Sequence, residues 1–471
     1  MPKNINIFRV ILATLILAIP LYPKFPLLGV AHTYVHIRLD DILIALAIFA
    51  WLIYQIKHKF PVLKLKITYI FLAYFIAIIL SSLNNYLVFQ TEPLSILLLH
   101  TLRRFQYMSL FFITLLAIPK PKDLNFAYTT LLITLFFVSL YGLGQKYLNF
   151  PVISTMNEEF SKGHILQMNI WTRISSTFAG HYDLAAYLTI VLIIIGSVFL
   201  LSKNLFVKYS SLCLWFIGFF LLNLTSSRIS TFAFWGGMVL ALLLIKKYFW
   251  IIPFSILMTL SIFQSKDLSQ RLLATIPSIN IQINKNKTPP PTPTIIPTTT
   301  PIETPSTPIV ETRPLTPTPT IIRNRENVDI EEFPEINFDE GVARSGEIRF
   351  NVEWPRAINA LRKNPIIGNG LGSITLATDN DFLRLLGESG ILGFTTFMFI
   401  FLYFFQKTIS VFFVKNKKIF ENMILVFWAC VLATLANAIF IDVFEASKFA
   451  YIFWIMMGIY YQCLQFYKNK K

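Results

Sequence analysis

Apolar runs of about twenty residues recur along most of the 471-residue chain, with short polar stretches between them. A helix of that length can cross the hydrocarbon core of a bilayer. The first run lacks a small-residue cleavage site, so we interpret it as a span rather than a signal peptide. The pattern predicts an all-α, polytopic membrane bundle of twelve helices, at about residues 6–22, 38–56, 66–84, 103–119, 124–143, 183–202, 208–225, 229–246, 248–264, 385–406, 419–441 and 446–465.

Composition supports this interpretation, because 55% of the residues are hydrophobic and only 14% are charged. Soluble domains carry about 25% charged residues. The composition therefore excludes a soluble cytosolic enzyme, a disulfide scaffold and a disordered chain. Cys213, Cys430 and Cys463 lie far apart in apolar runs, so we expect buried small side chains and no metal site or disulfide.

The net charge of +16 follows the predicted topology. With both ends in the cytoplasm, the cytoplasmic stretches hold 19 of the 41 Lys and Arg residues and only two acids, Asp123 and Glu421. This asymmetry is the positive-inside pattern of membrane proteins. No basic patch of the kind that binds nucleic acid is evident, so the expected partner is the lipid bilayer.

Two outer segments are longer than ordinary connections, at residues 144–182 and 265–384. The second separates a membrane domain, 1–264, from the last three helices, 385–471. Its middle, 288–320, holds 11 Pro and 12 Thr in 33 residues and favours extended polyproline II structure. We interpret it as a flexible or semi-rigid insert. The alternative is that its threonines are glycosylated.

A short amphipathic helix is predicted at residues 354–364 of the same loop. Pro355 suits a first helical position, and Ile358 and Leu361 form an apolar stripe. The residue before Pro365 disfavours helix, so the helix should end there. We expect it to lie on the outer membrane–water interface.

Three arginines are predicted on the outer face: Arg173, Arg228 and Arg349. Guanidinium is the preferred group for bidentate phosphate binding, so three of them in one cavity could hold a pyrophosphate. The alternative is that each is an interface anchor that reaches lipid headgroups.

Further polar groups lie where predicted helices begin. Asp379, Asn380, Asp381 and Glu388 precede or open the helix at 385–406. They are helix caps, or one of them is a carboxylate that accepts a proton from a hydroxyl.

His181 and Asp183 occupy the corresponding place before the helix at 183–202. We expect Asp183 to be the N-cap. His181 could titrate usefully, although a lone histidine is more often structural.

The alternating glycines Gly368, Gly370 and Gly372 suggest a phosphate-binding loop. A dinucleotide fold needs a preceding strand and a following helix, and neither is predicted here. The glycines therefore favour a sharp fold of the backbone against the membrane domain, with Gly368 and Gly370 kept as substrate-binding candidates.

Four segments in order carry a family resemblance: RISSTFAGHYDLAAYL, LTSSRISTFAF, RFNVEWPRAINALRKNPIIGNGLGS and DNDFLRLLGESGILGF. Over about residues 165–400 the chain resembles the O-antigen ligase and O-antigen polymerase superfamily of bacterial surface-polysaccharide assembly. Ser176 stands where that family usually has Gly, and Asp379 stands where it has His.

The resemblance implies a GT-C-like helical bundle with a large extracytoplasmic loop in the bacterial cytoplasmic membrane. Its members move a glycan from an undecaprenyl-diphosphate-linked donor to a glycan, lipid or protein acceptor, without metal, nucleotide sugar or other cofactor. Carried over by motif, Arg228 and Arg349 would bind the diphosphate, with Arg173 a further candidate. The spacing from Arg349 to Trp354 is about one residue longer than the family pattern, so Arg344 is an alternative to Arg349 as the basic residue of this motif.

The absent histidine bears on the chemistry, because residues 182–471 contain no His at all. Either Asp379 replaces it as the base, or this chain does something other than ligase chemistry. The absence favours the polymerase-like branch or one of undetermined chemistry. The predicted catalytic residues are thus Asp379, Arg228 and Arg349. The predicted substrate-binding residues are Arg173, His181, Arg344, Asn380, Gly368 and Gly370.

The main rival is a transporter or flippase of polysaccharide or lipid-linked glycan. Such a protein should carry ionisable residues along mid-membrane paths and internal repeats. The helix centres here are mostly apolar, and the charges gather at the outer face. A non-enzymatic scaffold would fit the Pro/Thr tract but not the four motifs. Glycosyl transfer on the outer face is the favoured prediction.

Overall fold

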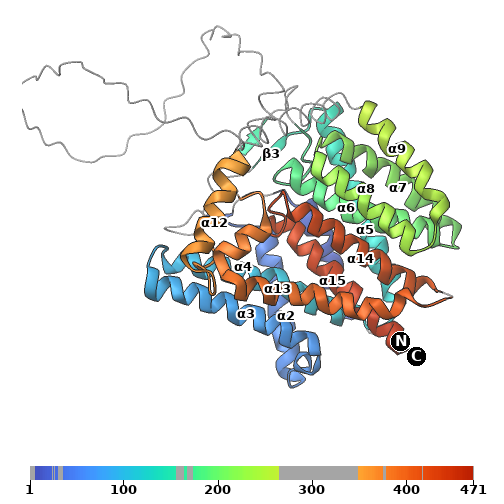
Figure 1. Ribbon diagram of the computed structural model, residues 1–471. Helices are drawn as coiled ribbons and strands as arrows, with labels where there is room; N and C mark the ends of the chain where they lie inside the picture. The colour runs from blue at the N-terminus through green and yellow to red at the C-terminus, as the bar shows by residue number, and fades with distance from the viewer. Residues whose placement is uncertain are drawn as a thin grey trace, which may run out of the picture.

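The computed structural model describes residues 6–23, 25, 27–29, 36–154, 164–166, 173–264, 348–374, 378–415 and 417–469. Each predicted apolar run forms an α-helix, and the helices pack into one bundle (Figure 1). They are α1 Ile7–Leu21, α2 Leu39–Lys57, α3 Lys66–Asn84, α4 Leu94–Ala117, α5 Asp123–Tyr147, α6 His181–Leu201, α7 Leu205–Leu224, α8 Arg228–Leu244, α9 Ile251–Gln264, α13 Asp381–Phe412, α14 Ile419–Ala438 and α15 Ser447–Lys468.

In the part of the chain that the structure describes, 8 helices are long and apolar enough to cross a membrane. They are α2, α3 with its extension to Phe89, α5, α6, α7, α13, α14 and α15. The apolar helices α1, α8 and α9 are shorter. The chain is therefore a multi-pass, all-helical membrane protein in outline, and twelve crossings remain a prediction.

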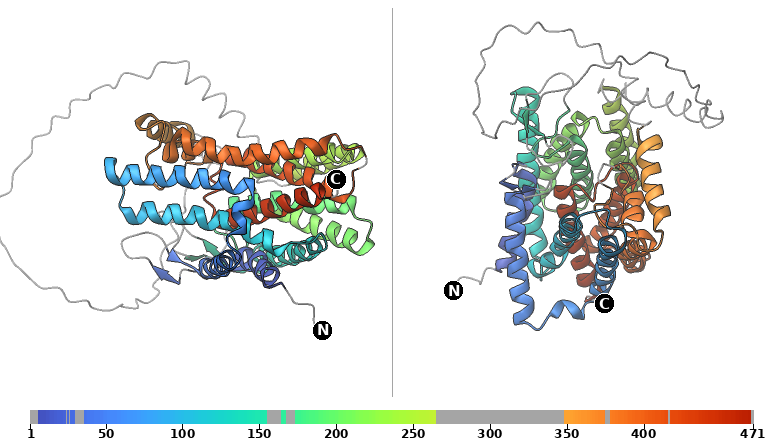
Figure 2. Two further views of the ribbon diagram at one scale, coloured as in Figure 1. Left: turned by 90° about the horizontal axis from the view of Figure 1, so that it is seen from below. Right: turned by 90° about the vertical axis from the view of Figure 1, so that its left-hand side faces the viewer.

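The bundle has a central layer and a lipid-facing rim. Helices α6 and α15 are the most enclosed, because 83% of the most apolar 18-residue stretch of each is buried. Around them, α4 packs on α15, α14 packs on α6 and α8, and α3 packs on α13. The long helices α3, α4 and α13 run side by side in the left view of Figure 2.

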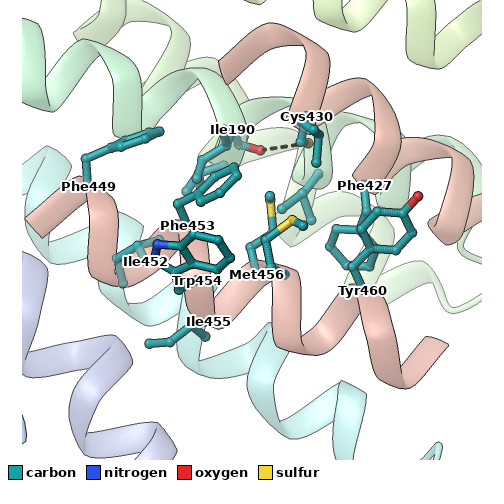
Figure 3. Packing of buried hydrophobic residues seen from close by; sticks show 14 of the residues in the cluster. Ile190, Phe427, Cys430, Phe449, Ile452, Phe453, Trp454, Ile455, Met456 and Tyr460 are labelled. Atoms are coloured by element: carbon teal, nitrogen blue, oxygen red, sulfur yellow. Dashed lines mark hydrogen bonds between the residues drawn. The ribbon is translucent and has the colours of Figure 1, made fainter. Parts of the chain in front are cut away.

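Aromatic and aliphatic side chains of α15 fill the core, which Figure 3 shows around Phe453, Trp454 and Met456. Cys430 contacts the Ile190 carbonyl oxygen there at 3.7 Å. The prediction of buried cysteines is confirmed for Cys430 and Cys463 but wrong for Cys213, which is exposed on α7.

Several helix ends differ from the prediction. Helix α4 begins at Leu94 rather than near residue 103. Arg104 can lie within this helix because its side chain forms an ion pair with Glu445. Helix α6 begins at His181 with Gly180 as its N-cap, so Asp183 lies in the first turn and is not the cap.

Short elements connect the helices. The strands β1 Leu28–Gly29 and β2 His36–Ile37 pair antiparallel, as do β3 Val152–Ser154 and β4 His164–Leu166. Runs of two or three residues give no alternating pattern, and the sequence did not predict them. The other short elements are η1 Pro61–Lys64, η2 Asn85–Phe89, η4 Tyr248–Trp250 and η5 Arg349–Glu353, of which η2 and η5 are π-helical.

The predicted amphipathic helix is present as α12, Trp354–Lys363, with Pro at its first turn and its end just before Asn364 and Pro365. It packs on α13 (Figure 1). Helix α13 bends at Gly390. The Pro/Thr tract at 288–320 and Arg344 lie outside the described residues.

Candidate functional site

The three predicted arginines meet around Tyr182, the second residue of α6. The Tyr182 hydroxyl accepts hydrogen bonds from the side chains of Arg173 and Arg349. Arg228 lies close enough to Tyr182, Arg173 and Arg349 to interact electrostatically with this group, and the two other arginines repel it. Segments that are far apart in the sequence therefore bring three guanidinium groups to one place.

The position of Arg228 is costly for a cation. It is the first residue of α8, and Thr225, Ser226 and Ser227 before it are buried. A helix N-terminus carries partial positive charge and favours anions. A guanidinium placed there beside two others gains stability from a bound anion.

Arg173 opens the loop that leads into α6, and its Nη1 lies 2.6 Å from His181 Nε2. Ser176 in this loop has φ +51°, a backbone region that favours glycine. The Gln145 side chain holds Ser176 through two hydrogen bonds. The Ser176 N–H donates to Gln145 Oε1 at 2.8 Å, and Gln145 Nε2 donates to the Ser176 carbonyl oxygen at 3.0 Å. The position where the resemblance expects Gly thus has a glycine-like conformation.

Lys448 on α15 anchors the same loop. It is fully buried, and its Nζ donates to the carbonyl oxygens of Pro20, Tyr22 and Thr177 at 3.1, 2.5 and 2.7 Å. It also lies 5.1 Å from the centre of the Phe178 ring. Lys448 could not be selected from the sequence, because a lysine at a helix start usually reaches solvent.

Arg349 reaches the cluster through a π turn. The N–H of Trp354 donates to the carbonyl of Arg349, five residues earlier, whereas an α turn spans four. The π turn accommodates one more residue than an α turn, which matches the extra residue between Arg349 and Trp354 relative to the pattern of the resemblance. Arg349 is buried, with only 8% of its surface exposed, and among the described residues of this segment it is the one that lies against Tyr182 and Asp379.

Asp379 forms an ion pair with Arg349. Its Oδ2 accepts a hydrogen bond from Arg349 Nε at 2.8 Å and lies 2.7 Å from Arg349 Nη2. Burial raises the pKa of the Asp379 carboxyl above its usual range, although Arg349 opposes the shift. Burial lowers the pKa of Arg349, but Asp379 and Tyr182 raise it by more.

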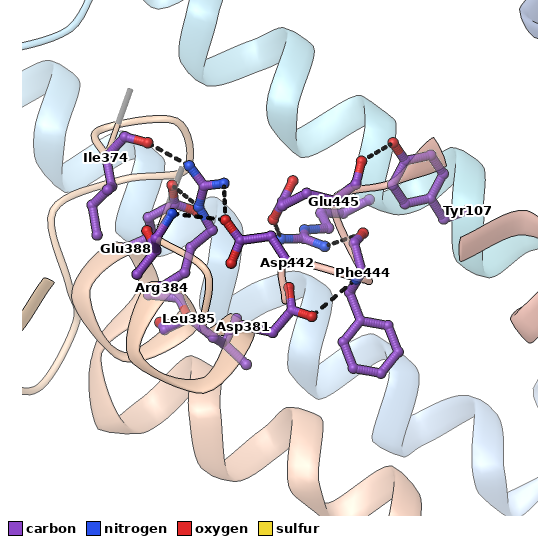
Figure 4. A network of polar contacts seen from close by, with 12 residues as sticks. Tyr107, Ile374, Asp381, Arg384, Leu385, Glu388, Asp442, Phe444 and Glu445 are labelled. Atoms are coloured by element: carbon purple, nitrogen blue, oxygen red, sulfur yellow. Dashed lines mark hydrogen bonds and ion pairs between the residues drawn. The ribbon is translucent and has the colours of Figure 1, made fainter. Parts of the chain in front are cut away.

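Asp442, between α14 and α15, fixes the backbone on both sides of Asp379. Its Oδ2 accepts the N–H of Thr378 at 2.8 Å, and its Oδ1 accepts the N–H of Asn380 at 3.0 Å. Arg384 contacts Asp442 at 3.4 Å and Glu388 at 3.6 Å (Figure 4). Asp379 itself has φ +48°. The two clamped amides hold this uncommon conformation.

The capping prediction is confirmed for Asn380, whose Oδ1 accepts the N–H of Leu383 at 2.9 Å at the start of α13. Asp381 accepts the N–H of Phe444 at 3.0 Å, which ties α13 to the loop before α15 (Figure 4). These two residues position the segment around Asp379.

Gly368 and Gly370 pack against α13 and α3. The Gly368 N–H donates to Asn364 O at 3.1 Å, and the Gly370 N–H donates to Glu388 O at 2.9 Å and to Ser81 Oγ at 3.0 Å. A Cβ at Gly368 would lie 2.4 Å from the Glu388 carbonyl. The backbone N–H groups of Gly368 and Gly370 thus donate to other groups of the protein. These contacts agree with the predicted sharp fold of the backbone against the membrane domain.

No family model matches the sequence, and no curated protein is similar to it. Among the described residues, no group of three or more His, Cys, Asp and Glu side chains is placed to hold a metal ion.

Tyr182, Asp442 and Lys448 were not predicted from the sequence. Tyr182 lies between His181 and Asp183, and its neighbours drew attention instead. Asp442 is one of two acids in a short connection, together with Glu445, and lies more than 60 residues from the segment that it holds. Only the first had a usable signal, its place within a motif.

Proposed function

We propose that this protein transfers or polymerises glycan from an undecaprenyl-diphosphate-linked donor onto an acceptor hydroxyl, on the outer face of the bacterial cytoplasmic membrane. The observation that carries the proposal is the convergence of Arg173, Arg228 and Arg349 around Tyr182. Planar guanidinium groups match the oxygens of a diphosphate.

In this proposal the arginines stabilise the leaving group. The acceptor oxygen attacks the anomeric carbon, the bond from that carbon to the diphosphate oxygen breaks, and the electron pair leaves with the diphosphate. Arg228 and Arg349 offset the charge that develops there, as preorganised donors do in a site with little water. Direct displacement inverts the anomeric centre.

Asp379 holds Arg349 until the donor binds. The hydrogen bond from Arg349 Nε and the ion-pair contact from Nη2 both go to one carboxylate oxygen of Asp379. An incoming diphosphate competes for the same guanidinium, so the pair keeps Arg349 oriented while its charge is partly neutralised. The predicted role of Asp379 as the base gives way here to a positioning role.

Two departures from the family pattern are compatible with the resemblance. Ser176 has the positive φ expected of Gly, and the π turn accommodates the longer spacing before Trp354. The interior of α6 from Leu188 to Ile195 is aliphatic apart from Thr189, which favours surface chemistry over a transmembrane polar path.

The test is a transfer assay with the purified full-length chain, a lipid-diphosphate-linked glycan and candidate acceptors. Arg228→Ala and Arg349→Ala should each lower the release of lipid diphosphate by at least about 100-fold. Arg362→Ala is the matched control, because Arg362 is exposed on α12. Normal transfer by both site variants would contradict the proposal. Lipid movement across vesicles without glycan transfer would point to the flippase instead.

A further inference from the structure

The start of α12 holds buried polar atoms that lack a protein partner. Among the described residues, these include Glu353 Oε2, Trp354 Nε1 and Arg356 Nη1. Buried polar atoms are nearly always hydrogen-bonded, and exceptions call for an explanation. Three of them within four residues form a concentration of unsatisfied polar groups that a polar ligand at this turn would satisfy.

This turn adjoins the arginine cluster. Glu353 is the last residue of the π turn that begins at Arg349, and it interacts electrostatically with Arg349, Asp379 and Asp442. A ligand group bound at Glu353 therefore lies beside the place where the leaving diphosphate would be held.

Glu353 also has the acid–base character that a proton acceptor needs. Burial, and then the nearby Asp379 and Asp442 carboxylates, raise its pKa to about 7. A base acts best when its pKa lies near the working pH. Asp379, in contrast, is occupied by its ion pair with Arg349.

An aromatic surface lies next to Glu353. The Trp354 ring contacts Phe350 edge-on with 4.6 Å between ring centres, and it lies 6.2 Å from Phe440. Phe350 and Phe440 are 44% and 36% exposed. Sugar rings present C–H groups that pack on aromatic faces, while their hydroxyls need polar partners such as the indole N–H.

We propose that the start of α12 is the acceptor subsite, where Glu353 accepts the proton of a sugar hydroxyl that is held against Trp354. This inference rests on the proposed function and names its acceptor class as a glycan. The Glu353 carboxylate takes the proton as the acceptor oxygen bonds to the anomeric carbon and the diphosphate departs. The proton then passes from Glu353 to water.

The experiment compares the full-length wild type with Glu353→Gln between pH 5 and pH 9, using a lipid-diphosphate-linked glycan and an oligosaccharide acceptor. Wild-type kcat should fall as the pH drops below about 7, because Glu353 becomes protonated. Glu353→Gln should lower kcat at pH 8 by at least about 100-fold and remove this dependence, with donor binding unchanged. Glu92→Gln, at a carboxyl before α4, is the matched control.

Folding is followed separately through the apparent unfolding midpoint. The folded state favours protonated Glu353, so wild-type stability should decline as the pH rises from about 4.5 to about 7. The difference between the unfolding midpoints, Glu353→Gln minus wild type, should therefore increase as the pH rises from about 4.5 to about 7 and stay constant above that. A constant difference would contradict the buried environment that the inference requires.

The outcomes separate the two proposals. If Arg228→Ala is inactive while Glu353→Gln keeps the wild-type rate and pH profile, only the role of Glu353 is overturned. If Arg228→Ala transfers glycan normally, the proposed function fails, and the acceptor subsite fails with it. Transfer to a non-sugar hydroxyl as fast as to the oligosaccharide would overturn the acceptor class alone.

Discussion

Individual charges at this site are held by groups that the substrate need not touch. Asp442 is the clearest case, because it accepts the backbone N–H groups on either side of Asp379 and also contacts Arg384. Hydrogen bonds to an ionised acceptor are stronger than neutral ones. The orientation of Asp379, and through it that of Arg349, depends on this one carboxylate.

Asp442→Asn is expected to lower the free energy of unfolding by about 2–3 kcal/mol, because the amide turns one acceptor into a donor that faces a backbone N–H. The rate of glycan transfer should also fall. This fall should exceed the one expected from the smaller fraction of folded protein, since Asp379 and Arg349 lose their orientation. Chemical unfolding in detergent and the transfer rate measure the two effects. An unfolding free energy equal to that of Glu92→Gln would contradict the clamp.

At the scale of elements, the loop after α12 and the bend in α13 are joined backbone to backbone. The Ile391 N–H donates to Pro365 O at 2.8 Å, and the Leu392 N–H donates to Ile366 O at 3.0 Å. Gly390 has φ +64° and ψ −172°, a conformation that is essentially restricted to glycine. This contact sets the position of α12, and hence of Arg349 and Glu353.

Gly390→Ala should therefore destabilise the protein by about 3 kcal/mol or more, since the new Cβ would lie 2.4 Å from the Ile366 carbonyl. Gly236→Ala is the matched control, because no atom lies within 4 Å of its added Cβ on α8. The control should be neutral or gain about 0.5–1 kcal/mol in helix stability. Thermal unfolding in detergent distinguishes the two, and equal midpoints would refute the backbone contact.

The sequence predicted helices better than their ends. Long apolar runs fix the existence of a membrane helix, because no other structure satisfies the backbone in lipid. The start of α4 was missed because Arg103 and Arg104 suggested a helix edge, whereas Arg104 is paired with Glu445 inside the bundle. Such pairing depends on a residue hundreds of positions away, which hydropathy cannot reveal.

The site followed the same rule. Arg173, Arg228 and Arg349 were predicted from residue type and motif, and the structure brings them together around Tyr182. Their supports, Asp442 and Lys448, were not predicted, since their partners come from distant segments. The π turn at Arg349 was also beyond the sequence, because its local pattern resembles an ordinary helix start.

At the scale of the whole molecule, the arginine cluster and the polar network around Asp442 share one end of the bundle. In Figure 4, Arg384, Asp442 and Glu445 lie together beside the ends of several helices. With a twelve-span topology, this end faces outward and the lysine-rich connections face the cytoplasm.

Single-cysteine labelling tests the number of crossings, after Cys213, Cys430 and Cys463 are replaced. Position 120 reports whether α4 crosses, and position 247 reports whether α8 crosses. An impermeant thiol reagent should label Ile366→Cys from the outer side only. It should reach Lys64→Cys, Lys120→Cys, Lys203→Cys, Lys247→Cys and Lys415→Cys from the cytoplasmic side only. Outer labelling at position 120 or 247 would reduce the number of spans.

The contacts of Lys448 have a consequence for biogenesis. Its ammonium group satisfies the carbonyl oxygens of Pro20 and Tyr22 at the end of α1, where helix carbonyls have no partner of their own. The ribosome must add 428 residues after Pro20 before that group exists. Until then the carbonyl oxygens of Tyr22 and Thr177 lack this donor, although the Thr177 hydroxyl can already donate to Pro20 O. This is a state that insertases and quality-control proteases can recognise. A nascent chain arrested before α15 should accordingly be held by the insertion machinery or degraded, even though its earlier helices are already made.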